Sequence, residues 1–293
     1  MTTEAITEAT GYCRYYYRLR LSSTARTALE AEWDRLRWVW NECVAKSRAV
    51  HAHNRAMGKK TTCGPVQLAA MLTEARARTQ WLREGACVPQ QQVIRDFGKS
   101  RAKALKDMKA GAPMRQRAGM PKWKKKREAL PTLEYTKRGF RLKDGRLHLA
   151  GGIVVRPVWS RQLPKAPSIV RVYRDAVGHW WASFVVPALT EALPATGRVI
   201  GIDWGVRETA TTTSDDHDLP HAQHGRTAAQ KLARYQRMMA RRRPAKGQAA
   251  SKGYREAKRQ TAKLHRKAAA QRADTGRKWA KKVVRDHDAI AVE

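Results

Sequence analysis

The 293-residue sequence is poor in acidic side chains, with 25 Asp and Glu against 60 Lys and Arg, which gives a formal net charge of +35. A charge of this size repels itself unless a polyanion neutralises it, so nucleic acid is the expected partner. Acidic membranes are the alternative polyanion. The sequence has no apolar run near the length of a membrane span, so we expect no membrane association.

Cysteine is also scarce. The four cysteines are widely separated and form no C-x-x-C pair. This spacing argues against a zinc site or a disulfide framework in this stretch and favours free thiols in a reducing compartment. The N-terminus lacks the basic start and apolar stretch of a secretory signal, so we expect an intracellular protein.

The first half of the sequence predicts one strand followed by helices. Residues 12–21 are rich in strand formers. Apolar residues then recur at spacings of three and four, which indicates a long helix with a buried stripe: Leu29, Trp33, Leu36, Trp40 and Val44. Two more helices are expected over 65–83 and 89–108, with these residues directed inward: Leu68, Met71, Leu72, Val93, Phe97 and Leu105. Residues 23–110 would thus form a three-helix module.

Residues 131–188 predict short strands separated by turns such as Lys143-Asp144-Gly145. Strands and turns at this density are typical of a small barrel. The strand at 12–21 would belong to the same barrel, which leaves the helical module as an insertion.

Two apolar strands in the last third of the chain each end on a carboxylate. The strand from residue 198 ends at Asp203, and the strand from residue 289 ends at Glu293. We expect both strands to be buried. A turn cap is the alternative role for Asp203 alone, but a second strand ending in the same way favours a shared role. Carboxylates on adjacent strands can hold a divalent metal ion against a phosphodiester.

The segment between these strands is extremely basic. Residues 226–287 contain 21 Lys and Arg against three Asp and Glu, and they predict two helices, the second over 251–286. Helix ion pairs cannot offset such an excess, so we favour a phosphate-facing role over an ordinary solvated surface. The Asp- and His-rich loop at 214–224 has the composition of a metal cluster, but we expect a solvated hairpin loop.

The order of these features resembles the transposon-encoded TnpB proteins and their miniature type V CRISPR relatives, which are RNA-guided DNA endonucleases with a RuvC domain. Six parts of the chain carry the resemblance: the opening strand at 17–19, the helix at 36–41, the glycine-x-proline-basic element at 119–127, the hairpin at 170–184, the first RuvC motif at 201–206, and the helix and strand at 264–293 that reach the second motif's glutamate.

The resemblance implies an α+β multidomain fold. Residues 1–22 and 120–190 would form a split, wedge-like β-barrel, and residues 23–119 a helical recognition module. Residues 191–293 would form the N-terminal part of an RNase H-like RuvC domain, with basic helices over 226–287.

The resemblance also implies site residues. Asp203 and Glu293 would be catalytic ligands of a two-Mg²⁺ site. Gln91 matches a position used to read the motif beside the target, and Gln can pair bidentately with adenine; a polar helix turn is the alternative. Further nucleic-acid contacts are expected from basic residues: Lys122, Lys124, Lys125, Lys126, Arg127, Arg241, Arg242, Arg243, Arg266, Lys267 and Arg272.

Two features of the family are missing, a zinc ribbon and a third motif with another aspartate. We therefore expect a truncated chain, with structural zinc confined to the missing part and two of three metal ligands present. The main hypothesis is a bacterial, cytoplasmic RNA-guided DNA endonuclease that joins the nucleoid when it binds DNA, with guide RNA and double-stranded target DNA as partners. The alternatives are a nuclease-deficient guided repressor and an unguided basic nucleic-acid-binding protein. The sequence does not distinguish a monomer from a dimer.

Overall fold

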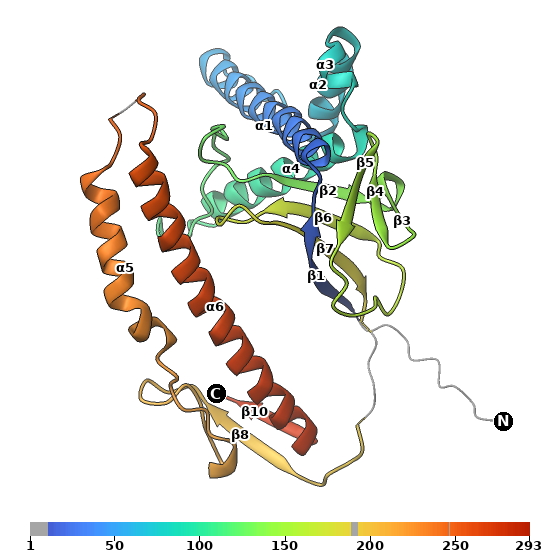
Figure 1. Ribbon diagram of the computed structural model, residues 1–293. Helices are drawn as coiled ribbons and strands as arrows, with labels where there is room; N and C mark the ends of the chain where they lie inside the picture. The colour runs from blue at the N-terminus through green and yellow to red at the C-terminus, as the bar shows by residue number, and fades with distance from the viewer. Residues whose placement is uncertain (1–10, 189–192, 246) are drawn as a thin grey trace, which may run out of the picture. The chain divides into compact units, whose positions relative to one another are not determined.

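The computed structural model describes residues 11–188, 193–245 and 247–293 (Figure 1). The chain divides into two compact units, Met1–Thr190 and Glu191–Glu293. Among the described residues, no helix is both long enough and apolar enough to cross a membrane.

The first unit is built on a seven-stranded antiparallel sheet that curls into a nearly closed, barrel-like shape (Figure 1). The strand order is β2-β6-β7-β1-β5-β4-β3, so the first strand of the chain lies in the middle of the sheet. The prediction of a barrel that includes this strand is confirmed. The strands are β1 (Tyr12–Arg20), β2 (Thr132–Thr136), β3 (Phe140–Lys143), β4 (Arg146–Leu149), β5 (Ile153–Pro157), β6 (Ile169–Arg174) and β7 (Trp180–Pro187).

Alternation along the strands separates the core of this sheet from its solvent face. On β1, Tyr17 and Leu19 are buried while Arg20 is exposed. The strands β4 and β5 alternate in the same way. The inner face therefore carries large apolar side chains, and basic side chains are left on the outer face.

A helical module is inserted between β1 and β2, as predicted. It contains α1 (Ser23–Met57), α2 (Pro65–Arg78), α3 (Gln80–Arg83) and α4 (Cys87–Lys109). Ser22 caps α1 by accepting the Ala25 N–H at 3.1 Å. Gly58 ends α1 in the left-handed region at φ 62°, a conformation that favours glycine. The predicted stripe of α1 is buried except at Trp40, which is half-buried.

Three details of the helical module differ from the prediction. The helix expected over 65–83 is broken by the extended backbone of Thr79 (φ −121°, ψ 105°). The helix expected to begin at Pro89 begins two residues earlier, at Cys87. Leu105 is 39% exposed and is not a core residue. The fully buried Ala104 takes the inward position instead, because it lies seven residues, or two helical turns, after Phe97.

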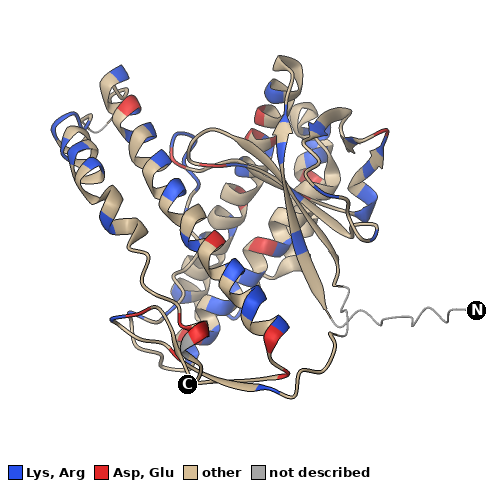
Figure 2. Ribbon diagram, turned by 60° about the horizontal axis from the view of Figure 1, so that its bottom comes forward, with Lys and Arg blue, Asp and Glu red and all other residues tan. Residues whose placement is uncertain are grey.

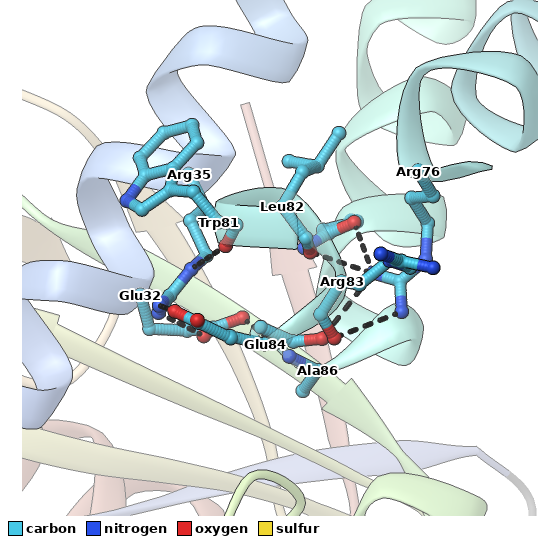
Figure 3. Close-up of polar contacts among 10 residues, drawn as sticks. Glu32, Arg35, Arg76, Trp81, Leu82, Arg83, Glu84 and Ala86 are labelled. Carbon is cyan, nitrogen blue, oxygen red and sulfur yellow. Dashed lines mark hydrogen bonds and ion pairs between the residues drawn. The ribbon is translucent and has the colours of Figure 1, made fainter. Parts of the chain in front are cut away.

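Arg76 on α2 holds the connection between α3 and α4 (Figure 3). Its Nη1 donates to the carbonyls of Leu82 at 3.0 Å and Gly85 at 3.2 Å, and to Oε1 of Gln90 at 2.6 Å. Helix ends leave carbonyls without an intrahelical partner. One guanidinium therefore satisfies the end of α3 and ties it to α4.

Glu32 and Arg35 on α1 complete this polar network (Figure 3). Oε1 of Glu32 accepts the buried N–H of Ala86 at 3.0 Å. Nε of Arg35 donates to the carbonyl of Trp81 at 2.7 Å, and its Nη1 lies 3.3 Å from the Glu32 carboxylate. Burial raises the pKa of Glu32, an effect that the neighbouring Arg35 opposes.

The second unit contains a three-stranded sheet of order β10-β8-β9. The strands are β8 (Val199–Asp203), β9 (Thr211–Thr212) and β10 (Ala289–Val292). β10 runs parallel to β8, and β9 runs antiparallel to it. β9 consists of two residues only.

The burial expected for β8 and β10 is wrong. Ile200 and Ile202 on β8 are buried with Val283 of α6 (Lys252–Asp286), but Val199 is 70% exposed. β8 is therefore covered on one face. β10 is exposed along its whole length, because it forms the edge of the sheet and the described residues supply no layer over it.

The remaining helices form a hairpin. α5 (His224–Arg241) packs along α6, which begins at the N-cap Ser251 (Figure 1). The apolar face of α5 is only half-buried, and the helix has no fully buried residue. The hairpin therefore presents most of its polar surface to solvent.

Candidate functional site

The parallel pairing of β8 with β10 brings the two predicted carboxylates to the same end of these neighbouring strands. Ile202 is opposite Val292 in the parallel register. One residue further, the N–H of Glu293 donates to the carbonyl of Ile202 at 3.1 Å. Glu293 therefore follows β10 at the level where Asp203 ends β8.

The alternation of β8 determines which way Asp203 points. Ile202 is turned toward the apolar cluster with α6, so Asp203 takes the opposite, open face. Asp203 and Glu293 are both exposed. They line one hollow of about 620 Å³ on this face.

The walls of this hollow are supplied by threonines that sequence reasoning missed. Thr211 is directly opposite Asp203 in the antiparallel register, and Thr213 also lines the hollow. Oγ1 of Thr213 accepts the Gly201 N–H at 3.0 Å. A Cβ at Gly201 would lie 3.0 Å from Cγ2 of Thr213, so glycine allows this close approach. The threonine-rich run at 209–213, typical of a strand, was the signal in the sequence.

The donor set fits a hard divalent cation. Mg²⁺ is commonly bound through one or two carboxylates, with water and substrate phosphate oxygens as its other ligands. In the parts of the chain that the structure describes, neither Asp203 nor Glu293 forms an ion pair. The same parts contain no group of three or more His, Cys, Asp or Glu arranged to hold a metal. The two carboxylates would thus need oxygen atoms from water or a phosphodiester.

Asp288 fixes the other end of the paired strands, a role that the sequence did not predict. Its carboxylate accepts the N–H groups of Thr196 at 2.8 Å and Gly197 at 2.7 Å, and the Thr196 hydroxyl at 2.9 Å. These hydrogen bonds lower the pKa of Asp288. The N–H of Asp288 also donates to the carbonyl of Arg198 at 2.9 Å. The register that aligns the carboxylates is therefore secured from its far end.

The loop at 214–224 is not fully solvated, in contrast to the expectation. His217 is 7% exposed, and its Nε2 lies 3.1 Å from Oδ2 of Asp286. This hydrogen bond lowers the pKa of Asp286. The His217 ring meets the buried His287 ring edge-on at 4.6 Å, and Trp279 donates to the His217 carbonyl at 2.6 Å. His217 therefore anchors the loop to the end of α6.

The basic run after the helical module is mostly exposed, with one exception. Lys126 pairs with Asp34 at 2.8 Å, and Lys125 pairs with Glu128 at 3.1 Å. Lys124 is half-buried, with its ammonium 3.8 Å from the ring centroid of Trp40. Burial lowers the pKa of Lys124. Lys124 therefore points into the helical module, while its neighbours remain accessible: Lys122, Lys125, Lys126 and Arg127.

The remaining predicted basic residues lie on the hairpin of the second unit. All six are exposed, and Figure 2 shows Lys and Arg along both of its helices. Nη1 of Arg242 donates to the carbonyl of Gly253 at 3.3 Å, which connects the end of α5 to the start of α6. The structure thus places three of these residues at the end of α5 and just after it, Arg241, Arg242 and Arg243, and the other three on α6, Arg266, Lys267 and Arg272.

Burial separates the three consecutive glutamines near the start of α4. Gln90 is fully buried and donates to the Leu82 carbonyl at 3.0 Å. Gln92 is 7% exposed and donates to Glu134 at 2.9 Å. Gln91 is exposed. Of the three, Gln91 is therefore the side chain available to a partner.

Comparisons with known proteins agree with the resemblance drawn from the sequence. Residues 177–293 match the family "OrfB_IS605: Probable transposase". A protein of Streptomyces pristinaespiralis named "Putative RNA-guided DNA endonuclease" is 28% identical over 253 residues, which cover 84% of this chain and 59% of that protein. The resemblance to the TnpB-like transposon-encoded proteins is thereby confirmed.

Two solved structures share a weaker likeness. The match to a chain of a Cas12f1-sgRNA-target DNA complex has a TM-score of 0.46 and 13% sequence identity. It covers 90% of this chain and 64% of the matched chain. The match to a chain of a CRISPR-Cas12f ternary complex has a TM-score of 0.41 and 11% sequence identity. It covers 93% of this chain and 63% of the matched chain. The chain thus spans less than two thirds of the length of each of these relatives.

Proposed function

We propose that this protein acts as an RNA-guided DNA endonuclease. It would bind a guide RNA, read a short motif beside the target and cleave the DNA at a RuvC-type metal site. The observation that carries this proposal is the register of β8 with β10. It sets Asp203 and Glu293 on one open hollow, within the residues that match the transposase family.

Each group around the hollow has a defined task in this proposal. Asp203 and Glu293 would hold Mg²⁺, which when bound activates water and stabilises the leaving oxygen. The exposure of both carboxylates leaves room for a nucleic-acid backbone. The hydroxyls of Thr211 and Thr213 can donate hydrogen bonds to phosphate oxygens. Gly201 keeps the floor of the hollow free of a side chain.

The rest of the chain would bind and position the nucleic acids. The exposed Arg and Lys of α5 and α6 would hold a phosphate backbone through charge. Residues 1–22 and 120–190 would form the wedge-like barrel, 23–119 the recognition module, and 191–293 the RuvC-like domain. Gln91 would read the motif, since its side chain is exposed at the start of α4. Such a nuclease would act in the bacterial cytoplasm.

The test uses the full-length protein with a guide RNA, a matched DNA duplex and Mg²⁺. Asp203→Asn and Glu293→Gln should each reduce cleavage to background while guided binding is retained, because they remove a metal ligand and add no bulk. Asp216→Asn is the matched control, since it removes the same charge from an exposed residue of the second unit that does not line the hollow. Cleavage that persists in both carboxylate variants would refute the proposal.

A guided repressor is the second candidate function. In this role the chain would bind a guide RNA and a matched duplex without cutting the DNA. The same assay separates the two functions. A wild-type protein that binds the matched duplex but leaves it uncut in Mg²⁺ would support the repressor.

A further inference from the structure

Four basic residues form one row across four neighbouring strands of the barrel. Lys143 is directly opposite Arg146 in the β3–β4 register, and Arg20 is directly opposite Arg156 in the β1–β5 register. In the β4–β5 register, the pairing of Leu147 with Val155 places Arg146 opposite Arg156 one step further on. We call the set Lys143, Arg146, Arg156 and Arg20 the basic row. With strands roughly 4.8 Å apart, it spans about 14 Å.

The basic row lies on the solvent face of the sheet. Each of its three arginines has a neighbour along the strand that is buried in the barrel core, with exposures of 0% for Leu147, 2% for Val155 and 5% for Leu19. Because successive side chains on a strand point to opposite faces, the basic row points outward. All four of its members are exposed. The strands that carry it are neighbours at one side of the barrel in Figure 1.

Nothing within residues 11–188 neutralises the basic row. None of its four side chains takes part in a hydrogen bond or an ion pair there. Its three arginines line a hollow of about 420 Å³ whose other residues are apolar or neutral: Leu21, Ser22, Val154 and Val155. Asp144, in the turn between β3 and β4, forms no ion pair with the basic row. Arg141, opposite His148, adds another cation on the same face.

This arrangement works against the stability of the free protein. Like charges directly opposite each other on antiparallel strands are destabilising. A row of three such pairs would be relieved by a multivalent anion that follows it. Guanidinium groups recognise phosphate bidentately, and a nucleic-acid backbone offers phosphates in a series.

We propose that the basic row is a binding site for the sugar–phosphate backbone of a nucleic acid. The inference rests on the proposed function for the identity of the polyanion, but it shares no residue with the carboxylate hollow. RNA and DNA present the same phosphodiester chemistry to the arginines. The basic row would therefore bind with little regard to base sequence and with a strong dependence on salt.

The first test measures binding of the full-length protein to a single-stranded RNA, a single-stranded DNA and a DNA duplex of one sequence over a range of salt concentrations. In the triple variant R20Q/R146Q/R156Q, the slope of log K against log salt should fall by roughly 2–3 for the nucleic acid that occupies the basic row. A loss confined to RNA assigns the basic row to the guide, and a loss confined to the duplex assigns it to the target.

A matched control removes the same charge elsewhere in the first unit. The triple variant R14Q/R55Q/R78Q changes exposed arginines on β1, α1 and α2 that lie outside the basic row. This control should keep most of the wild-type slope. Equal slopes in the two triple variants would overturn the inference, because binding would then depend on net charge alone.

A second measurement separates binding from folding. Arg156→Gln should leave the melting temperature of the free protein unchanged or raise it, since Arg156 faces two like charges, while weakening binding several-fold. A lower melting temperature with unchanged affinity would overturn the inference and indicate a structural arginine. The nuclease proposal fails separately. Persistent cleavage in Asp203→Asn would sink that proposal, whereas loss of binding in the R20Q/R146Q/R156Q variant would still support the basic row.

Discussion

Asp288 and Thr196 are 92 residues apart in the chain, yet the Asp288 carboxylate accepts both the main-chain N–H and the hydroxyl of Thr196. This contact joins the segment before β8 to the start of β10. It acts at the opposite end of the strands from Asp203 and Glu293. The alignment of the two carboxylates therefore depends on a residue that does not touch the hollow.

The first prediction concerns the pH dependence of this contact. Hydrogen bonds from Thr196 and Gly197 lower the pKa of Asp288 in the folded protein. A lowered folded pKa means that the stabilisation is present above the unfolded value of about 3.9 and is lost as the pH falls through the folded value. Asp288→Asn should therefore melt at a lower temperature than wild type at pH 7, and the gap should narrow below about pH 4.

Thermal melts at pH 7 and pH 3 check this expectation. Asp274→Asn is the control, because it removes the same charge from a pair with Lys278 on the exposed face of α6. A gap between wild type and Asp288→Asn that stays constant across this pH range would contradict the assignment.

The second prediction concerns binding of divalent cations without any cleavage assay. A ligand that binds only the folded state stabilises it by RT ln(1 + [L]/Kd), so Mg²⁺ at ten times its Kd should add about 1.4 kcal/mol. We expect this stabilisation in the wild type and its loss in Asp203→Asn and Glu293→Gln. The measurement is the melting temperature with and without Mg²⁺. An equal increase in wild type and both variants would place the cation elsewhere.

The third prediction concerns the buried carboxylate of the helical module. Glu32→Ala leaves the buried Ala86 N–H without an acceptor, which should cost about 1–3 kcal/mol of unfolding free energy. Glu32→Gln retains an acceptor oxygen and should cost less than about 1 kcal/mol at pH 7. Chemical denaturation of the two variants compares these costs. Equal losses would show that the charge of Glu32, rather than its hydrogen bond, stabilises the module.

The raised pKa of Glu32 also predicts how the stability difference between the wild type and Glu32→Gln changes with pH. Burial raises the pKa of Glu32 in the folded protein. The stabilisation that this carboxyl contributes is therefore fully present below its pKa in the unfolded chain and is lost as the pH rises through its pKa in the folded protein. The wild type should therefore lose stability relative to Glu32→Gln as the pH rises above about 4. The opposite trend would mean that Arg35 outweighs burial.

The fourth prediction separates the adjacent glutamines. Gln90→Ala should cost about 1–3 kcal/mol, because it removes a fully buried side chain together with its hydrogen bonds to Arg76 and to the Leu82 carbonyl. Gln91→Ala should change stability by less than about 0.5 kcal/mol but alter the preference for bases beside the target. Denaturation and a binding assay over a library of flanking sequences measure the two effects. An unchanged preference in Gln91→Ala would remove Gln91 from the readout.

The helical module shows how far local patterns reach. The three- and four-residue spacing from Leu29 to Val44 predicted the buried stripe of α1. The same reasoning failed at Leu105, where the neighbouring Ala104 turned inward. Periodicity gives the face of a helix, but the partner that covers this face decides which residue is buried.

The hollow lined by Asp203 and Glu293 also shows which features local sequence patterns predict and which they do not. The sequence placed Asp203 and Glu293 each at the end of an apolar strand. It did not reveal that β8 is covered on one face, that Thr211 stands opposite Asp203, or that Asp288 secures the far end. Nor did it separate Lys124, which turns toward Trp40, from its exposed neighbours. All of these depend on contacts between segments far apart in the chain.

The amino-acid sequence alone determined the basic charge, the order of helices and strands and the positions of the two strand-end carboxylates, because these follow from composition and from spacings within about ten residues. Only the tertiary structure decided which residues from distant segments meet. The basic row exists because four strands are aligned so that Arg20, 136 positions from its partner Arg156, lies directly opposite it. Strand register is set by turns and by core packing, which short-range patterns do not encode.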